Sequence, residues 1–373
     1  MYKKTIFSVL ALLLLLTACK REEMVGDKVF VVSSNPLLSN TKLTVNNSAP
    51  DFSVSNKKTG TAVFFAAGFS TDVSWKIVIN GSVSKAYREI KGVGKSINLS
   101  NSAWEGDANS VVFFQKGDSC TASLYVLGID TAIASTHLVI KKMLSYKNRT
   151  VDNVRYLLVD DFDGNHGGAA GMTAASGDVQ DAALSYFIGN EQRVNGSNCF
   201  HMEGTDINNN GWVFSMNHYA LVEMVSAHLD SNIAATSEEN FYINLYIRGT
   251  GKVNSAVAVK LLEYDYAKTR EQLRDTITKQ GFVFTPSVVK TCDAWVCSIP
   301  VNWEGWRLVS IPYSRFKADN NLTAGGNGNR VKEPWKITSM AVSLLSDPAF
   351  GSSVAVDIDF VVLSEGGPFV PKY

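Results

Sequence analysis

The stretch Phe241-Tyr242-Ile243-Asn244-Leu245-Tyr246-Ile247-Arg248 alternates strictly between apolar side chains and polar or amphipathic ones. Successive side chains of a β-strand point to opposite faces of the sheet, so this period of two predicts a strand with one face in a core. The inward face would hold Phe241, Ile243, Leu245 and Ile247, and the outward face would hold Tyr242, Asn244, Tyr246 and Arg248.

Strand signals continue on both sides of this stretch. Downstream, four more apolar segments predict strands: Val257–Tyr264, Trp306–Pro312, Ile337–Leu345 and Val354–Leu363. Upstream, short apolar runs alternate with Asn- and Gly-containing turns, and Val73–Ile79 is a core-strand candidate with Trp75 inside. Ala267–Gln280 is the one clear helical candidate, because Leu273 and Ile277 stand four residues apart among charges. The sequence therefore predicts an all-β protein.

The strand pattern and a polar connector predict two domains. Residues 29–144 contain several short strands and no amphipathic helix, which predicts a small antiparallel sandwich. In size and position this unit resembles the Ig-like spacers that follow the lipid anchor in Bacteroidetes surface proteins. Ser145–Val154 is a polar connector, and residues 153–366 form the second predicted domain.

The N-terminus has the features of an export signal. Lys3 and Lys4 precede the apolar segment Ile6–Ala18, whose 13 residues reach only about 20 Å as a helix and are too short to span a bilayer. The sequence Leu16-Thr17-Ala18-Cys19 resembles the lipobox of bacterial lipoproteins, and Lys20–Glu23 resembles the surface-export signal of Bacteroidetes lipoproteins. We therefore expect a signal peptide at 1–18, lipidation of Cys19 and an anchor linker at 19–28. The expected location is the outer membrane, exposed at the cell surface.

Composition excludes some partners. The chain has 35 basic and 35 acidic residues with no cationic run, which argues against a nucleic-acid partner. Beyond the signal no apolar stretch is long enough to span a membrane, so we expect membrane contact through the lipid anchor only. Cys292 and Cys297 have a spacing that a disulfide across a turn would allow, whereas Cys120 and Cys199 read as small buried side chains.

Acidic residues offer few catalytic arrangements. Glu263 and Asp265 alternate on one predicted strand end, as paired carboxylates do in some jelly-roll hydrolases. No third acid extends the pattern, so solvated charges at a strand end explain it better. His201, Glu203 and Asp206 read as another strand end and turn.

Four segments in the second domain carry a family resemblance. They are Asp161-Phe162-Asp163-Gly164, Asn210–Phe214 with its Gly-Trp pair, Asn302–Phe316 with Gly305-Trp306 and Ser310-Ile311-Pro312, and Val356–Leu363. In order and spacing they resemble the galactose-binding-like jelly-roll of carbohydrate-binding modules. They also look like the C-terminal domain of Sus-type surface glycan-binding lipoproteins. The resemblance covers about 153–366 and implies a β-jelly-roll behind the Ig-like sandwich, with Trp306, Leu308 and Ile311 packed inside and Phe316 closing the next turn.

The resemblance also implies a structural calcium. In many such modules an acid near the first strand and another on the last strand hold the ion, and Asp161 or Asp163 with Asp359 match those positions. Solvated turn acids are the alternative.

A glycan is the implied ligand, because sugars bind to aromatic rings and to polar side chains beside them. Tyr242, Asn244, Tyr246 and Arg248 offer that mixture on one strand face, and Trp295 and Trp303 are further platforms next to expected turns. Ordinary surface tyrosines are the alternative. We expect a non-catalytic glycan-binding lipoprotein that serves an outer-membrane importer, with a jelly-roll hydrolase or lyase, or an adhesin or assembly subunit, as alternatives.

Overall fold

The computed structural model describes residues 40–53, 62–146, 149–151, 153–164, 172–176, 183–189, 193–194, 196–205, 211–218, 233, 235–253, 255–264, 292–319, 329–346 and 353–369. Cys19, the predicted linker, the predicted helix 267–280 and Asp265 lie outside these residues. In the described part strands dominate, and helical structure is limited to α2 (Leu99–Ser102) and the 3-10 turns η1 (Tyr313–Arg315) and η2 (Pro334–Lys336). The all-β prediction is confirmed. None of the described helices has the length and apolar character needed to cross a membrane.

Residues 40–146, which we call the first domain, build one antiparallel sheet. Its strands are β1 (Thr44–Val45), β2 (Phe65–Gly81), β3 (Tyr87–Ile97), β4 (Ser119–Val126) and β5 (Ala134–Val139). Their order is β1-β2-β4-β5, and β3 pairs with β2 on the edge opposite to β4. Trp75, Ile77 and Ile79 alternate along β2 into a buried core, as the sequence predicts for Trp75. The Ig-like assignment of this domain stays a prediction.

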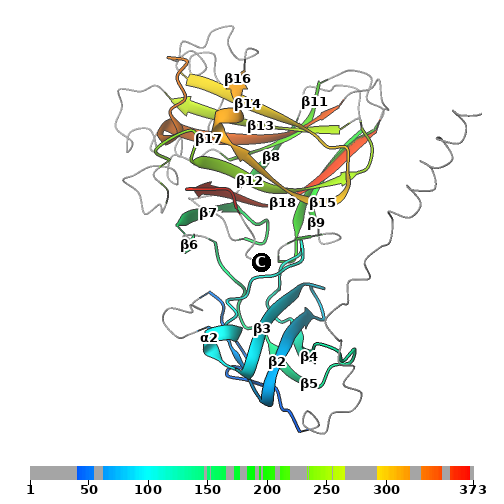
Figure 1. The fold of residues 1–373 in the computed structure, drawn as a ribbon. Helices are drawn as coiled ribbons and strands as arrows, with labels where there is room; N and C mark the ends of the chain where they lie inside the picture. The colour runs from blue at the N-terminus through cyan, green and yellow to red at the C-terminus, as the bar shows by residue number, and fades with distance from the viewer. Residues whose placement is uncertain are drawn as a thin grey trace, which may run out of the picture.

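Residues 149–369, the second domain, form two antiparallel sheets (Figure 1). The seven-stranded sheet has the order β15-β12-β18-β10-β9, and β7 pairs with β18 and β6 with β7. Its strands are β6 (Arg149–Val151), β7 (Val154–Asp160), β9 (Ala183–Gly189), β10 (Cys199–Thr205), β12 (Phe241–Thr250), β15 (Glu304–Pro312) and β18 (Val354–Glu365). The six-stranded sheet has the order β16-β14-β13-β17-β11-β8. Its strands are β8 (Thr173–Ser176), β11 (Gly211–His218), β13 (Ser255–Tyr264), β14 (Cys292–Pro300), β16 (Lys317–Ala318) and β17 (Ile337–Ser346).

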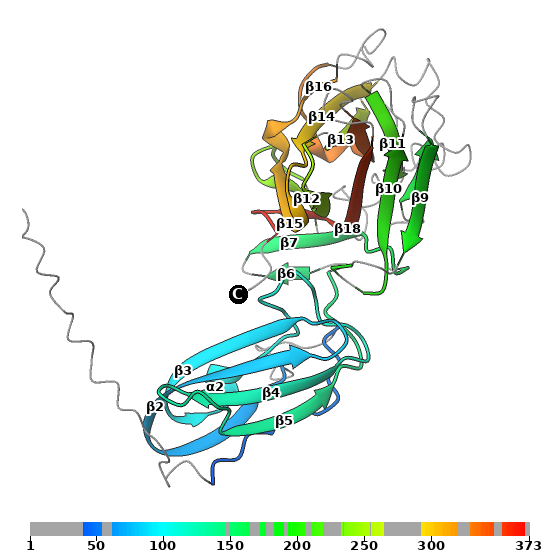
Figure 2. The same cartoon turned by 90° about the vertical axis from the view of Figure 1, so that its right-hand side faces the viewer.

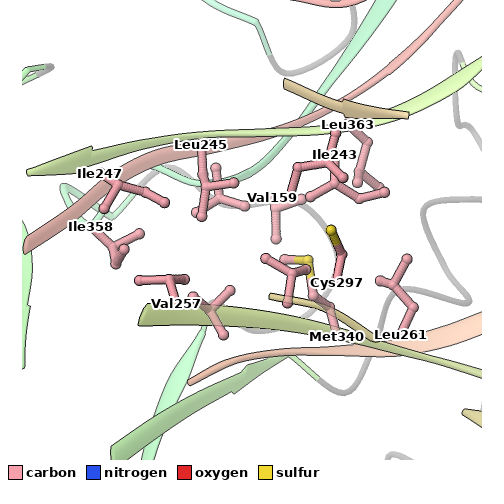
Figure 3. Packing of buried hydrophobic residues seen from close by; sticks show 14 of the residues in the cluster. Val159, Ile243, Leu245, Ile247, Val257, Leu261, Cys297, Met340, Ile358 and Leu363 are labelled. Atoms are coloured by element: carbon pink, nitrogen blue, oxygen red, sulfur yellow. The ribbon is translucent and has the colours of Figure 1, made fainter. Parts of the chain in front are cut away.

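The two sheets pack face to face around one apolar core. Figure 3 shows Ile243, Leu245 and Ile247 of β12 meeting Val257 and Leu261 of β13 across the gap. These side chains are fully buried, because the period of two directs every second residue of each strand into the core. The result is a β-sandwich, and its finer assignment as a jelly-roll stays a prediction.

The Cys292–Cys297 disulfide that the spacing would allow is not formed. Both residues lie on the uninterrupted strand β14, where five residues of extended chain separate their Cα atoms by about 16 Å, beyond the roughly 7 Å that a disulfide spans. Cys297 is a free, buried thiol. Cys120 and Cys199 are free and buried as predicted, and burial raises the pKa of the Cys120 thiol to about 12.

The first domain packs against the outer face of the seven-stranded sheet, beside β7, β12 and β18 (Figures 1 and 2). Phe113 of the first domain meets Tyr246 and Phe360 edge to face, with ring centroids 5.6 and 5.0 Å apart. Residues 109–112 form a bend, and Phe113 follows directly after it. The backbone amide of Phe113 donates to the carbonyl of Val194 at 2.7 Å, which fixes this bend to the second domain.

Candidate functional site

The inward register predicted for β12 is confirmed. Phe241, Ile243, Leu245 and Ile247 are each fully buried in the sandwich core. The other four side chains therefore point to the outer face of the seven-stranded sheet, where the first domain covers part of the surface.

The expectation that Asn244 and Tyr246 contact ligand is wrong. Tyr246 is 1% exposed beneath Phe113 and Phe360, and Asn244 is fully buried. The Asn244 amide nitrogen donates to the Val362 carbonyl at 3.1 Å, while its oxygen accepts from the Phe369 amide at 2.9 Å. Tyr246 thus lies in the interface between the domains, and Asn244 binds the C-terminal segment to β12. Tyr242 is half-buried.

Arg248 lies beyond this interface and belongs to a line of side chains that crosses the sheet. Backbone pairing places Trp306 opposite Arg248, Arg248 opposite Asp357, and Asp357 opposite His201, on strands β15, β12, β18 and β10. We call these four residues the cross-strand row. Arg248 and His201 remain partly exposed, with side-chain fractions of 29% and 20%, whereas Asp357 between them is buried.

Asp357 holds the row together. One carboxylate oxygen accepts from Arg248 Nη1 at 2.8 Å, and the other lies 2.6 Å from His201 Nδ1. The hydrogen bond to Asp357 raises the pKa of His201, burial opposes that rise, and Glu203 adds to it from 3.6 Å. His201 and Glu203 were expected at a strand end, but they lie within β10. The arrangement presents fixed charges and hydrogen-bonding groups beside an indole ring.

The expected packing of Trp306 and Leu308 inside the sandwich is wrong. Ile311 is buried in the core as predicted, but residues 306 and 308 have the opposite parity on β15 and face outward. Both are half-buried against the interface cluster around Tyr246. Trp306 is thus an outer-face aromatic, next to Arg248.

The expected platforms Trp295 and Trp303 are wrong as well, because both are buried in the core at 7% and 8% exposure. Trp303 donates from Nε1 to the Ile247 carbonyl at 3.3 Å, and Trp295 donates from Nε1 to Glu263 at 3.0 Å. The sequence placed them near turns, but β14 continues through Trp295.

Glu263 of β13 accepts hydrogen bonds from three separate segments of the second domain. Tyr313 Oη donates to it at 2.5 Å and the Glu333 amide at 2.7 Å, in addition to Trp295. Burial raises the pKa of Glu263 to about 7 although these donors oppose the rise. At 2% exposure, this carboxyl group secures turns and is closed to a substrate.

The acids expected to bind calcium make protein contacts of their own. Asp359 accepts from the Val194 amide at 2.6 Å, and Asp163 accepts from the Ser197 amide at 2.8 Å and from the Asn198 side chain at 3.0 Å. Burial, aided by Asp161, raises the pKa of Asp163 to about 6. Among the described residues no three His, Cys, Asp or Glu side chains group as a metal site. A calcium shared by Asp161 or Asp163 with Asp359 stays a prediction.

The opposite surface of the sandwich carries a different polar feature. Lys260 of β13 faces outward and forms an ion pair with Asp319 at 2.6 Å, although both side chains are nearly buried. Beside it Ser343 is 1% exposed, and its hydroxyl finds no hydrogen-bond partner among the described residues. The lysine inside the apolar run of residues 255–262 was the sequence signal for this pair.

No protein-family model matches this sequence, and no curated protein matches it either. Solved structures show likeness at low identity. A family 11 carbohydrate-binding module from Clostridium thermocellum, solved with a β-1,3-1,4-mixed-linked tetrasaccharide, is 15% identical with a TM-score of 0.35, over 56% of this chain and 94% of that module. A family 30 carbohydrate-binding module is 11% identical with a TM-score of 0.35, over 61% and 94%.

Another likeness covers more of the chain. SGBP-B, from a complex xyloglucan utilization locus in Bacteroides uniformis, is 12% identical with a TM-score of 0.32, over 87% of this chain and 72% of that protein. At such identities and TM-scores, these likenesses establish neither a common fold nor a common ligand.

Proposed function

We propose that this protein is a cell-surface lipoprotein that binds polysaccharide or oligosaccharide without cleaving it. The glycan would lie across the uncovered part of the seven-stranded sheet. The observation that carries the proposal is the cross-strand row, in which Trp306 stands next to Arg248, Asp357 and His201 on adjacent strands.

The chemistry of the row suits a sugar. A pyranose ring offers an apolar C–H face to an indole and hydroxyl groups to fixed donors and acceptors at its edge. Asp357 already orients Arg248 and His201, so little side-chain entropy is lost when a ligand binds. The spacing of neighbouring strands, about 4.8 Å, also spreads the row over more than one sugar residue.

Capture without cleavage fits the state of the acids. Glycoside hydrolysis needs a protonated carboxyl group that reaches the glycosidic bond and a second carboxylate close by. Glu263 has the raised pKa but is buried among three donors, and Asp357 is engaged by Arg248 and His201. These two carboxyl groups therefore give no support to the hydrolase or lyase alternative among the described residues, which do not include Asp265.

The anchor rests on the sequence Leu16-Thr17-Ala18-Cys19. Cys19→Ala removes the thiol that would be acylated, so we expect the variant to leave the membrane fraction. Metabolic labelling with a fatty-acid analogue checks this directly. Label on the alanine variant would contradict lipidation at Cys19.

Affinity electrophoresis of the full-length chain through gels that contain soluble polysaccharides tests the binding claim. We expect retardation by at least one neutral polysaccharide, with no release of oligosaccharide after prolonged incubation. Release of product would support the hydrolase or lyase. Unretarded migration on every gel would contradict glycan binding and favour a protein ligand, as in an adhesin or assembly subunit. A glycan ligand would in turn favour importer components as partners.

A further inference from the structure

The first domain carries a surface pocket that the proposed site does not use. Its volume is about 630 Å³, within the range of small-ligand sites, and it lies where β2, β3 and β4 run side by side. Because Trp75 and Ile77 point into the core, their neighbours Ser74 and Lys76 on β2 point to the outer face. The pocket is therefore a hollow in the outer surface of the sheet.

Two cross-strand lines of side chains shape this hollow. The first contains Val93, Ser74 and Leu127, since Val93 pairs with Ser74 and the Leu127 amide donates to the Ser74 carbonyl at 2.9 Å. Val93 and Leu127 are 73% and 77% exposed, so two apolar walls stand in water on either side of a small hydroxyl residue. Exposed apolar side chains that line a hollow mark a candidate ligand site.

The second line contains Lys91, Lys76 and Tyr125. Lys76 pairs directly with Lys91 on one side and with Tyr125 on the other, and its ammonium lies 5.5 Å from the Tyr125 ring centroid. Like charges placed directly opposite each other destabilise a sheet. Among the described residues, Glu89 is the carboxylate within ion-pair distance of both ammonium groups, at 2.5 Å from Lys91 and 3.7 Å from Lys76, and Asp130 also lines the pocket. The two lysines thus share one close carboxylate, and an anionic ligand would add a second.

We propose that this pocket binds an anionic sugar residue, such as a hexuronate, as a second carbohydrate site on the molecule. The carboxylate would lie on Lys76 and Lys91, and the apolar faces of the ring on Tyr125, Val93 and Leu127. Polar and apolar groups are interleaved along the pocket, as they are around a sugar ring, whereas an acyl chain would offer the lysines and Ser74 no polar group. The inference takes its ligand class from the proposed function and rests on it to that extent.

The experiment is affinity electrophoresis of the full-length chain through polygalacturonate, its fully methyl-esterified form and polyglutamate at physiological salt. We expect retardation by polygalacturonate alone. Lys76→Met keeps the apolar stem of the side chain and should weaken the affinity for polygalacturonate about tenfold, as loss of a hydrogen bond to a charged group does. Tyr125→Ala should weaken that affinity about fivefold. Lys116→Met, an equal charge change at an exposed site outside the pocket, should match the parent.

Three results would overturn the pocket proposal: no retardation by polygalacturonate, equal retardation by polyglutamate, or a Lys76→Met variant that matches Lys116→Met. Neutral polysaccharides on parallel gels separate the two claims. If neutral glycan retains the chain and Lys76→Met does not change retention by polygalacturonate, the pocket proposal fails and the second-domain site stands. Lys76-dependent retention of polygalacturonate alone keeps the pocket and removes that site.

Discussion

At the scale of single residues, buried carboxyl groups decide how the loops of the second domain are fastened. Glu263 collects donors from β14, η1 and the residue before η2, which are distant in sequence. Lys332 lies close by, with its ammonium 5.7 Å from the ring centroid of Trp295 and 3.0 Å from Glu238. A carboxylate in such a place is costly to ionise, which explains its raised pKa.

This environment predicts a pH dependence of folding. The folded pKa of about 7 exceeds the ordinary value of 4.5, so the folded state holds the proton more tightly. The free energy of unfolding should therefore fall as pH rises from 4.5 to 7, by about 3 kcal/mol from this group. Urea unfolding at pH 5 and 7.5 checks this, and Glu263→Gln should reduce the slope, of which part remains because the pKa values of Asp163 and His201 are raised as well. Glu239→Gln, at an exposed position, is the control. Parallel slopes in the parent and Glu263→Gln would refute the assignment.

At the scale of strands, the sequence pattern predicted the inward faces well. The alternation in Phe241–Arg248 identified the core residues of β12, because a period of two is a local property. The same pattern left open what covers the opposite face, so Asn244 and Tyr246 were assigned to a ligand. The family resemblance implied that Trp306 packs inside. Its position on β15, five residues before the buried Ile311, instead puts it on the outer face.

Glycine positions give a test of the β2–β3 pairing. Gly92 pairs with Trp75, and a Cβ at residue 92 would collide with the indole, whereas a Cβ at Gly68 would meet nothing within 4 Å. We expect Gly92→Ala to lower the free energy of unfolding by about 1–3 kcal/mol through overpacking. Gly68→Ala should change it by less than about 1 kcal/mol, the size of a glycine propensity effect. Equal effects in thermal or urea unfolding would show that Trp75 does not lie over Gly92.

At the scale of the whole molecule, the interface between the domains is the feature that sequence reasoning missed. It gathers Phe113, Tyr146, Tyr246, Phe360 and Phe369 into one aromatic cluster. These residues share no motif or period, since they come from both domains and the C-terminal segment. Their meeting follows only from the three-dimensional packing, which also sets how much of the seven-stranded sheet stays uncovered.

Phe113→Ala should loosen this interface. Phe113 is half-buried, so we expect a loss of about 2 kcal/mol, below the 3–5 kcal/mol typical of a fully buried phenylalanine. Small-angle X-ray scattering should show a larger radius of gyration. Phe69→Ala, at a partly buried position on the first-domain core, should cost similar stability without this expansion. An unchanged scattering profile for Phe113→Ala would show that this ring does not hold the domains together.

The central claim is that glycan binds at the cross-strand row, and titration calorimetry with the polysaccharide selected by the gels tests it most directly. Trp306→Ala should weaken binding about fivefold, the worth of one aromatic contact. Arg248→Met should weaken it about tenfold or more, as for a charged hydrogen-bonding group. The matched controls Trp335→Ala and Arg330→Met, at exposed positions off the row, should bind as the parent does. Parent-like affinity in folded Trp306→Ala and Arg248→Met would contradict the account.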